Sequence, residues 1–161
     1  MHDTDVLANV FKRNKMVIER QVQGLSHTDS LLQPDMRGNC LNFVLGHILA
    51  HREIVMEMLG LEAMMTPVER SRYDHGADPI FAEGEGVMHL DKLVDLIDKS
   101  NDVIIEALAQ LSQEDLETEV KRGDSSATLG KRLEFYSWHE TYHVGQTEYL
   151  RQLAGTDDHV I

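Results

Sequence analysis

Apolar residues recur every three to four positions along four long segments of the chain, and this spacing predicts four amphipathic helices. We place these helices at about Thr4 to Gly24, Asn39 or Cys40 to Gly60, His89 to Leu111, and Thr128 to Ala154. A glycine lies at or just past the end of three of the four, where helices commonly stop. No segment gives a convincing strand pattern.

The connection between the second and third predicted helices runs from Leu61 to Met88 and contains two prolines. A short helix is expected within it, near Pro67 to Ser71. A helix of about 22 residues is roughly 33 Å long, and a connection of this length can span that distance. The second and third helices can therefore run parallel. The fold class predicted is all-α: a single four-helix bundle domain over residues 1–161, with a long connection between helices 2 and 3.

A weak internal repeat supports this division. Leu25-Ser26-His27-Thr28-Asp29 and Leu111-Ser112-Gln113-Glu114-Asp115 both read Leu-Ser-x-x-Asp, and each follows an odd-numbered helix. One interpretation is a common signal that stops one helix and caps the next. The other is a bundle built from two similar helix pairs. The sequence alone does not choose between them.

Charge and composition exclude some classes of function. Against 15 lysines and arginines stand 28 acidic residues, a formal net charge of −13, which repels phosphate backbones. We therefore expect no nucleic-acid partner. No apolar run approaches the roughly 18 to 20 residues of a membrane span, and the N-terminus does not resemble a signal peptide. A cytoplasmic protein without membrane attachment is expected.

Two pairs of histidines carry the chemistry of the sequence. His47 and His51 are four residues apart, as are His139 and His143, so each pair lies on one face of its helix. Both faces belong to the apolar stripes. A single buried histidine is usually a core residue bonded to a carbonyl, but several converging imidazoles favour a shared divalent metal. Zinc or nickel is expected, although imidazole also suits copper and iron.

The second pair also spells H-E-x-x-H, which in one class of hydrolase supplies two zinc ligands and a general base. Those proteases need a further ligand downstream. Where a histidine would stand six residues after His143, this chain has Tyr149, and Glu148 is too close on the same helix. We therefore interpret the motif as a coincidence of spacing. Glu140 is left as either a candidate base or a bystander.

Two segments then resemble a known family. Residues 38–52 read Gly-Asn-Cys-Leu-Asn-Phe-Val-Leu-Gly-His-Ile-Leu-Ala-His-Arg, and residues 138–146 read Trp-His-Glu-Thr-Tyr-His-Val-Gly-Gln. These segments are similar to the second and fourth helices of the DinB-like (DinB/YfiT) superfamily. The resemblance implies a four-helix bundle that holds a metal through His47, His139 and His143. It also implies a homodimer. Family members with assigned activities are metal-dependent hydrolases, isomerases or transferases that use low-molecular-weight thiols such as bacillithiol, mycothiol or glutathione.

Further polar residues lie on the inward faces. His51 is a candidate fourth ligand, a proton-transfer partner or, as we favour, a group packed against the ligands, and Gln146 is a second such group. Asn14 and Asn101 are mid-helix, and we interpret them either as an interhelical hydrogen bond or as a polar wall of the pocket beside the metal. Cys40 is interpreted as a packing residue rather than a nucleophile.

The sequence thus predicts a metal-dependent enzyme for small-molecule substrates, either a thiol-dependent S-transferase or a hydrolase. The metal would act as a Lewis acid that lowers the pKa of bound water or of a bound thiol. The alternative is a non-catalytic, stress-associated metal-binding protein that acts through a protein partner. An open coordination position favours the enzyme, and a closed shell of four ligands favours the alternative. The connection from Leu61 to Met88 either covers the pocket or is a plain surface loop.

Overall fold

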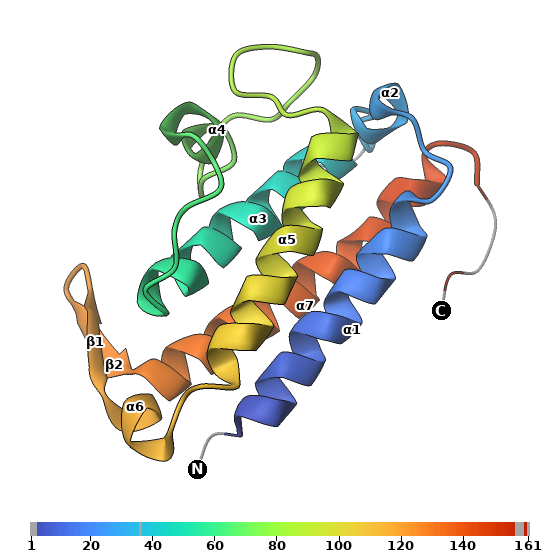
Figure 1. Cartoon of the computed structure of the whole chain (residues 1–161). Coiled ribbons are helices and arrows are strands. Elements are labelled where there is room, and N and C mark those ends of the chain that lie inside the picture. The colour runs from blue at the N-terminus through green and yellow to red at the C-terminus, as the bar shows by residue number, and fades with distance from the viewer. Residues whose placement is uncertain (1–2, 36, 157–159, 161) are drawn as a thin grey trace.

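The computed structural model describes residues 3–35, 37–156 and 160, and four long helices dominate it. They are α1 (Thr4–Val22), α3 (Leu41–Met58), α5 (Leu90–Leu108) and α7 (Leu129–Gln152). Each falls within one of the four periodic segments, so the mostly helical fold expected from the sequence is confirmed. Figure 1 shows the four helices packed along one another.

The helices pack in a closed cycle. Both α1 and α3 contact α5 on one side and α7 on the other. In Figure 1, α3 and α5 run in the same direction, and α1 and α7 run in the opposite one. The parallel α3 and α5 require the long connection between them, as the sequence analysis expected.

Three short helices begin with the same local signal. They are α2 (His27–Ser30), α4 (Pro67–Arg72) and α6 (Gln113–Glu117). Each has a capping box, in which a hydroxyl and a carboxylate three residues later accept hydrogen bonds from each other's backbone N–H. The two Leu-Ser-x-x-Asp segments are therefore capping signals, and α4 is the short helix expected in the connection.

One element departs from the all-helical expectation. Strands β1 (Glu119–Arg122) and β2 (Ser125–Thr128) form an antiparallel hairpin in which Glu119 pairs with Thr128. Gly123 occupies the turn with a φ of +57°. The expectation of no strand was wrong here. Strands of four mostly exposed residues bury too few side chains to produce an alternating apolar pattern.

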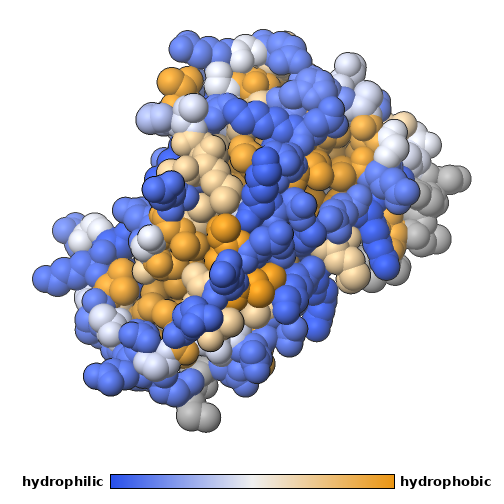
Figure 2. Space-filling model, viewed as in Figure 1, coloured by the Kyte–Doolittle hydropathy of each residue, from blue (hydrophilic) through white to orange (hydrophobic). Residues whose placement is uncertain are grey.

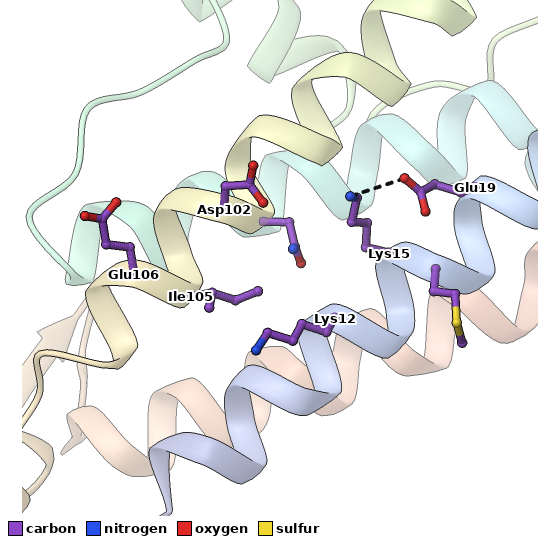
Figure 3. Close-up of a pocket in the computed structure, with 8 residues that line it drawn as sticks. Lys12, Lys15, Glu19, Asp102, Ile105 and Glu106 are labelled. Carbon is purple, nitrogen blue, oxygen red and sulfur yellow. Dashed lines mark ion pairs between the residues drawn. The ribbon is translucent and has the colours of Figure 1, made fainter.

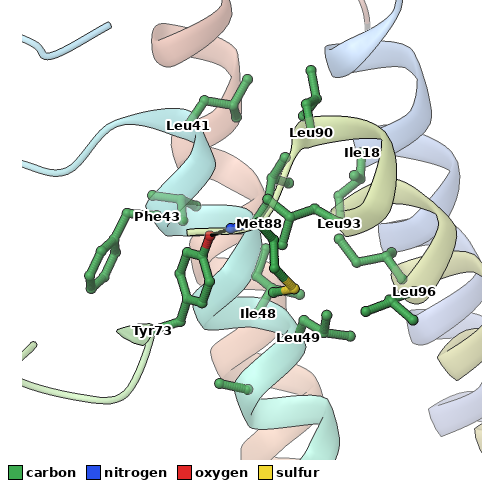
Figure 4. Packing of buried hydrophobic residues seen from close by; sticks show 14 of the residues in the cluster. Ile18, Leu41, Phe43, Ile48, Leu49, Tyr73, Met88, Leu90, Leu93 and Leu96 are labelled. Carbon is green, nitrogen blue, oxygen red and sulfur yellow. Dashed lines mark hydrogen bonds between the residues drawn. The ribbon is translucent and has the colours of Figure 1, made fainter. Parts of the chain in front are cut away.

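The apolar core forms two clusters along the length of the four helices. One surrounds Ile48, Tyr73 and Leu93 between α3, α5 and the long connection, as Figure 4 shows. The other surrounds Phe11 and Ile104, nearer the hairpin. Between the two clusters each long helix contributes buried polar side chains: Asn14, Arg52, Ser100, Asn101, Ser137 and Glu140. The histidine pairs lie at the level of this polar layer.

The surface seen in Figure 2 is mostly hydrophilic, with apolar residues between the polar ones. Within the described part of the chain, every helix is too short or too polar to cross a bilayer.

Candidate metal centre

The four histidines of the two pairs meet between α3 and α7. The centroids of the His47 and His51 rings are 4.4 Å apart, and those of His139 and His143 are 4.5 Å apart. Between the helices, the His51 and His139 rings are 4.1 Å apart, and the His47 and His143 rings are 4.8 Å apart. The convergence expected from helical spacing is therefore present.

Two of the rings are oriented by a hydrogen bond on Nδ1. The Nδ1 atom of His47 lies 2.8 Å from the backbone oxygen of Tyr73, and that of His143 lies 2.7 Å from Oε1 of Gln146. Because both oxygens can only accept a hydrogen bond, Nδ1 must carry the proton, and a neutral ring then has its lone pair on Nε2. This arrangement is the usual one for a metal-binding histidine. Gln146 holds the supporting position expected for it.

The inward nitrogens of α7 lie close together. The Nε2 atoms of His139 and His143 are 3.2 Å apart. Two nitrogens bound to one tetrahedral zinc at 2.0–2.1 Å would be separated by about 3.3 to 3.4 Å. Without a cation, two lone pairs at this distance require a proton on one of them. The pair is therefore spaced either for one shared proton or for one shared metal ion.

His51 and His139 add nitrogens that have no partner among the described residues. Both ring nitrogens of His51 and the Nδ1 atom of His139 are buried without a hydrogen bond. Leaving a buried polar group unpaired costs about 1 to 3 kcal/mol. His47, His51 and His139 can each direct one ring nitrogen so that all three lie within 4.8 Å of one another. An imidazole-rich cluster with unused nitrogens fits a divalent transition metal.

Burial keeps these imidazoles neutral. Loss of solvent lowers the pKa of His51 from 6.5 to about 3 and that of His139 to about 4, and the neighbouring histidines contribute to both shifts. Burial also lowers the pKa of His47 and His143, partly opposed by the hydrogen bonds on their Nδ1 atoms. Metal binding requires the neutral ring, so this environment suits a ligand set at neutral pH.

Glu140, the glutamate of the H-E-x-x-H motif, is hydrogen-bonded to Arg52. Its two carboxylate oxygens accept hydrogen bonds of 2.8 Å from Nε and Nη2 of Arg52. Both side chains are almost fully buried. The carboxylate is engaged by a buried guanidinium, so the residue is a structural partner of Arg52 rather than an available base.

The same arginine joins a third helix to the pair. Its Nη1 atom donates to the backbone oxygen of Ile97 at 2.6 Å and to Oγ of Ser100 at 3.1 Å. The guanidinium also lies 5.8 Å from the centre of the Phe11 ring on α1. Arg52 therefore fixes the relative positions of the helices directly beside the histidines.

Tyr73, from the long connection, packs against the N-terminal half of α3. Its hydroxyl donates to Asn42 and accepts a hydrogen bond from the backbone N–H of Met88, both at 2.8 Å. Its ring lies over Gly46, where a Cβ added to the glycine would come 2.1 Å from Cδ1 of the ring. The glycine thus lets the tyrosine backbone approach His47.

A cavity of about 910 Å³ opens onto three of the histidines: His47, His139 and His143. The rest of its wall combines apolar and polar residues from α3, from α7 and from two connections. Residues 74–77 of the long connection line it, so that connection covers part of the pocket. His51 does not line this cavity.

The two asparagines belong to the polar layer, but neither lines this cavity. Asn14 donates to Oγ1 of Thr141 at 3.1 Å, which is an interhelical hydrogen bond between α1 and α7. Asn101 lines a separate groove of about 460 Å³ between α1 and α5, whose walls carry Lys12, Lys15 and Asp102 (Figure 3). Cys40 is fully buried, and burial raises the pKa of its thiol, as expected for a packing residue.

Several residues of the site carry no signal of their own in the sequence. Arg37, His75 and Leu153 line the cavity, and none belongs to a recognisable motif. The Arg52–Glu140 pair joins residues 88 positions apart. The one available signal was an arginine inside the apolar run of α3, which must find a buried acidic partner.

Comparison with known proteins agrees with this architecture. A model of the DinB superfamily matches residues 11–147. A solved structure of a conserved protein from Enterococcus faecalis superposes with a TM-score of 0.74 at 15% identity, covering 97% of this chain and 99% of that one. A DinB-like protein from Bacillus cereus superposes with a TM-score of 0.70 at 17% identity, covering 96% and 95%. No curated protein matches the chain.

Proposed function

The chain belongs to the DinB superfamily, and from this premise we propose that it is a divalent-metal-dependent enzyme acting on small molecules. His47, His139 and His143 would hold the metal. The observation that carries the proposal is that these three imidazoles face one open cavity, with two Nε2 atoms 3.2 Å apart. The cyclic packing of α1, α5, α3 and α7 supports the four-helix bundle expected for the family.

The residues around the histidines would prepare them for this role. The Tyr73 carbonyl and the Gln146 amide hold the protons of His47 and His143 on Nδ1, which leaves Nε2 available. Burial keeps the rings neutral, and the Arg52–Glu140 pair holds α3 and α7 in register. A divalent cation bound there would supply Lewis acidity, which would lower the pKa of a bound water or thiol toward neutrality.

The cavity is suited to a substrate with both apolar and polar parts. Phe43, Val44 and Leu150 give it apolar wall, and Arg37 and Asn39 offer donors for a carboxylate or carbonyl. As the leading reaction we propose S-transferase chemistry, in which the sulfur of a low-molecular-weight thiol attacks an electrophile and stays bonded to its own carbon. Hydrolysis of a small substrate is the second. Zinc and nickel are the metals to test first because imidazole nitrogens suit both.

A second candidate function rests on His51. Its unpartnered nitrogens lie next to His47 and His139, so a fourth imidazole is available to close the shell. A metal with four protein ligands is usually structural. In that case the protein would be a non-catalytic, stress-associated metal-binding protein that acts through a protein partner.

Turnover by the metal-loaded protein separates the two candidates. The wild type would be loaded with zinc or nickel and incubated with bacillithiol, mycothiol or glutathione and a panel of electrophiles, with a hydrolysis panel run without thiol. The proposal predicts metal-dependent turnover that His143→Ala abolishes. His89→Ala is the matched control, since this exposed histidine lies outside the site. Metal binding without turnover in any assay would favour the non-catalytic role.

A further inference from the structure

The groove between α1 and α5 carries charged side chains that have no partner among the described residues. It has a volume of about 460 Å³ and shares no lining residue with the cavity at the histidines. Lys12 stands on the α1 wall, and Asp102 and Glu106 stand on the α5 wall (Figure 3). Within the described part of the chain, none of these three side chains makes a hydrogen bond or an ion pair. The groove therefore presents charges of both signs that are free to bind a ligand.

The second lysine of the groove is already neutralised. Nζ of Lys15 lies 3.2 Å from Oε1 of Glu19, and Asp98 is a further partner of the same amine. The charges left over are thus one ammonium group on α1 and two carboxylates on α5. The two carboxylates are four residues apart on one helix face, where like charges repel each other. A cationic group beside them is therefore favourable.

These charges select for a ligand that carries both signs. A simple cation would be repelled by Lys12, and a simple anion would be repelled by Asp102 and Glu106. A molecule with an ammonium group and a carboxylate can place each of them against the wall of opposite charge. The groove is therefore complementary to a zwitterion.

A buried amide beside the charges has an unused acceptor. Asn101 lines the groove and is only 4% exposed, and its Oδ1 atom is buried without a hydrogen bond. This oxygen can only accept. Turning the amide about its last side-chain bond lets Oδ1 accept from a donor held in the groove. An ammonium group has three donors, so it can bond to this oxygen and to the neighbouring Asp102 together.

Two apolar side chains complete the walls. Met16 of α1 is 42% exposed, and Ile105 of α5 is half-buried and lies between the two helices in Figure 3. They suit a ligand with a short apolar part next to its charged groups. The volume of the groove is within the range of small-molecule sites, about 300 to 1,000 Å³.

We propose that this groove binds a zwitterionic α-amino acid with an apolar side chain. Lys12 holds the carboxylate of the ligand, and Asp102 and Oδ1 of Asn101 hold its ammonium group. Met16 and Ile105 cover its side chain. Because the groove is separate from the histidine cavity, the proposal does not depend on the proposed function, and it can be tested on the metal-free protein.

A titration of the metal-free, isotope-labelled protein followed by NMR tests the site, with L-leucine as the probe. The proposal predicts saturable shifts of the backbone amides that line the groove and of the side-chain amide of Asn101. Isoamylamine is leucine without its carboxylate, and isocaproate is leucine without its ammonium group. Each should bind at least about tenfold more weakly than leucine, because each leaves one charged wall without a partner.

Charge-removing variants locate the two ends of the ligand. Lys12→Gln and Asp102→Asn should each weaken leucine binding by about tenfold or more. Lys131→Gln and Asp124→Asn are the matched controls, because they remove the same charges at exposed positions outside the groove, and they should leave the affinity unchanged. Since all four positions are exposed, each variant should keep the helical circular dichroism of the wild type.

Asn101→Leu separates a ligand contact from a structural role. The change removes a buried oxygen that has no partner, so the unfolding free energy should not fall, while leucine affinity should fall by about tenfold. A variant that is less stable and still binds leucine as the wild type does would give Asn101 a structural role and overturn its assignment to the site.

Three results would overturn the proposal as a whole. The first is the absence of saturable shifts with L-leucine, L-methionine and L-phenylalanine at millimolar concentration. The second is binding of isoamylamine or of calcium chloride at least as tight as that of leucine, which would make the groove a cation site. The third is a set of leucine-induced shifts confined to α3 and α7, which would place the amino acid in the cavity at the histidines.

Discussion

At the residue scale, the orientation of His47 depends on a glycine one position before it. Gly46 admits the ring of Tyr73, and the backbone oxygen of Tyr73 accepts the Nδ1 proton of His47. A side chain on residue 46 would occupy the space of that ring. The position of a metal-ligand candidate is therefore set by the absence of one methyl group.

Gly46→Ala should destabilise the protein and disturb His47. The added Cβ would lie 2.1 Å from Cδ1 of Tyr73, and such overpacking costs about 1 to 3 kcal/mol. Denaturant unfolding measures the loss, and zinc affinity should fall with it because Tyr73 must move. The matched control is Gly145→Ala on the exposed face of α7, where alanine should stabilise by about 0.5 to 1 kcal/mol. Equal stability of the two variants would contradict this account.

At the element scale, α3 and α7 are joined by the buried Arg52–Glu140 pair. Each long helix presents polar side chains at the same level, and this polar layer separates the two apolar clusters. Apolar contacts are not directional, so the clusters do not by themselves determine the register of the helices. A bidentate ion pair is directional and short in range. It therefore specifies which turn of α3 lies beside which turn of α7.

Glu140→Ala should cost about 3 to 5 kcal/mol of unfolding free energy, because the charge of Arg52 would remain buried without its partner. The matched control is Glu106→Ala, an exposed glutamate on α5, which should change stability by less than about 0.5 kcal/mol. Urea denaturation of both variants gives the comparison. If Glu140→Ala were as stable as the control yet lost all turnover, Glu140 would be a general base after all.

The sequence predicted those elements whose stability comes from burying one face of a helix. Their apolar spacing repeats over five or more turns, and glycines and capping residues mark their ends. The hairpin was missed because its eight strand residues bury little. The helical spacing predicted that Asn14 and Asn101 lie on inward faces, and both are buried. The spacing could not predict which neighbouring helix each would face.

The same limit applies to the site. Spacing of four residues brings both histidines of a pair to one face, and that part could be predicted. The partner of Glu140 could not, because it depends on the rotation and height of α3 relative to α7. Likewise, the contribution of Tyr73 depends on how a long, irregular connection folds back over α3.

At the scale of the whole molecule, a cluster of neutral imidazoles makes stability depend on pH. Burial lowers the pKa of His51 to about 3 and that of His139 to about 4, from 6.5 in the unfolded chain. At a pH between the folded and the unfolded pKa of each ring, the unfolded state binds more protons than the folded state. Stability is therefore fully present above about pH 6.5 and is lost as the pH falls toward 4.

The metal-free protein should accordingly lose up to about 1.4 kcal/mol per pH unit for each such histidine on acidification. Chemical denaturation of the protein in chelator, repeated from neutral pH to about pH 5, measures the slope. His51→Asn removes one of the two groups and should give a shallower dependence. An unfolding free energy that stays constant between pH 6.5 and 5 would show that these rings are not buried as neutral bases.

The most direct test of the central claim is a zinc titration of the metal-free protein, monitored by calorimetry or by competition with a chromophoric chelator. The account predicts one zinc ion per chain for the wild type and for His89→Ala. His47→Ala, His139→Ala and His143→Ala should each weaken binding by at least about tenfold, with a smaller loss for His51→Ala. Three alanine variants that bind zinc as tightly as the wild type would contradict the account.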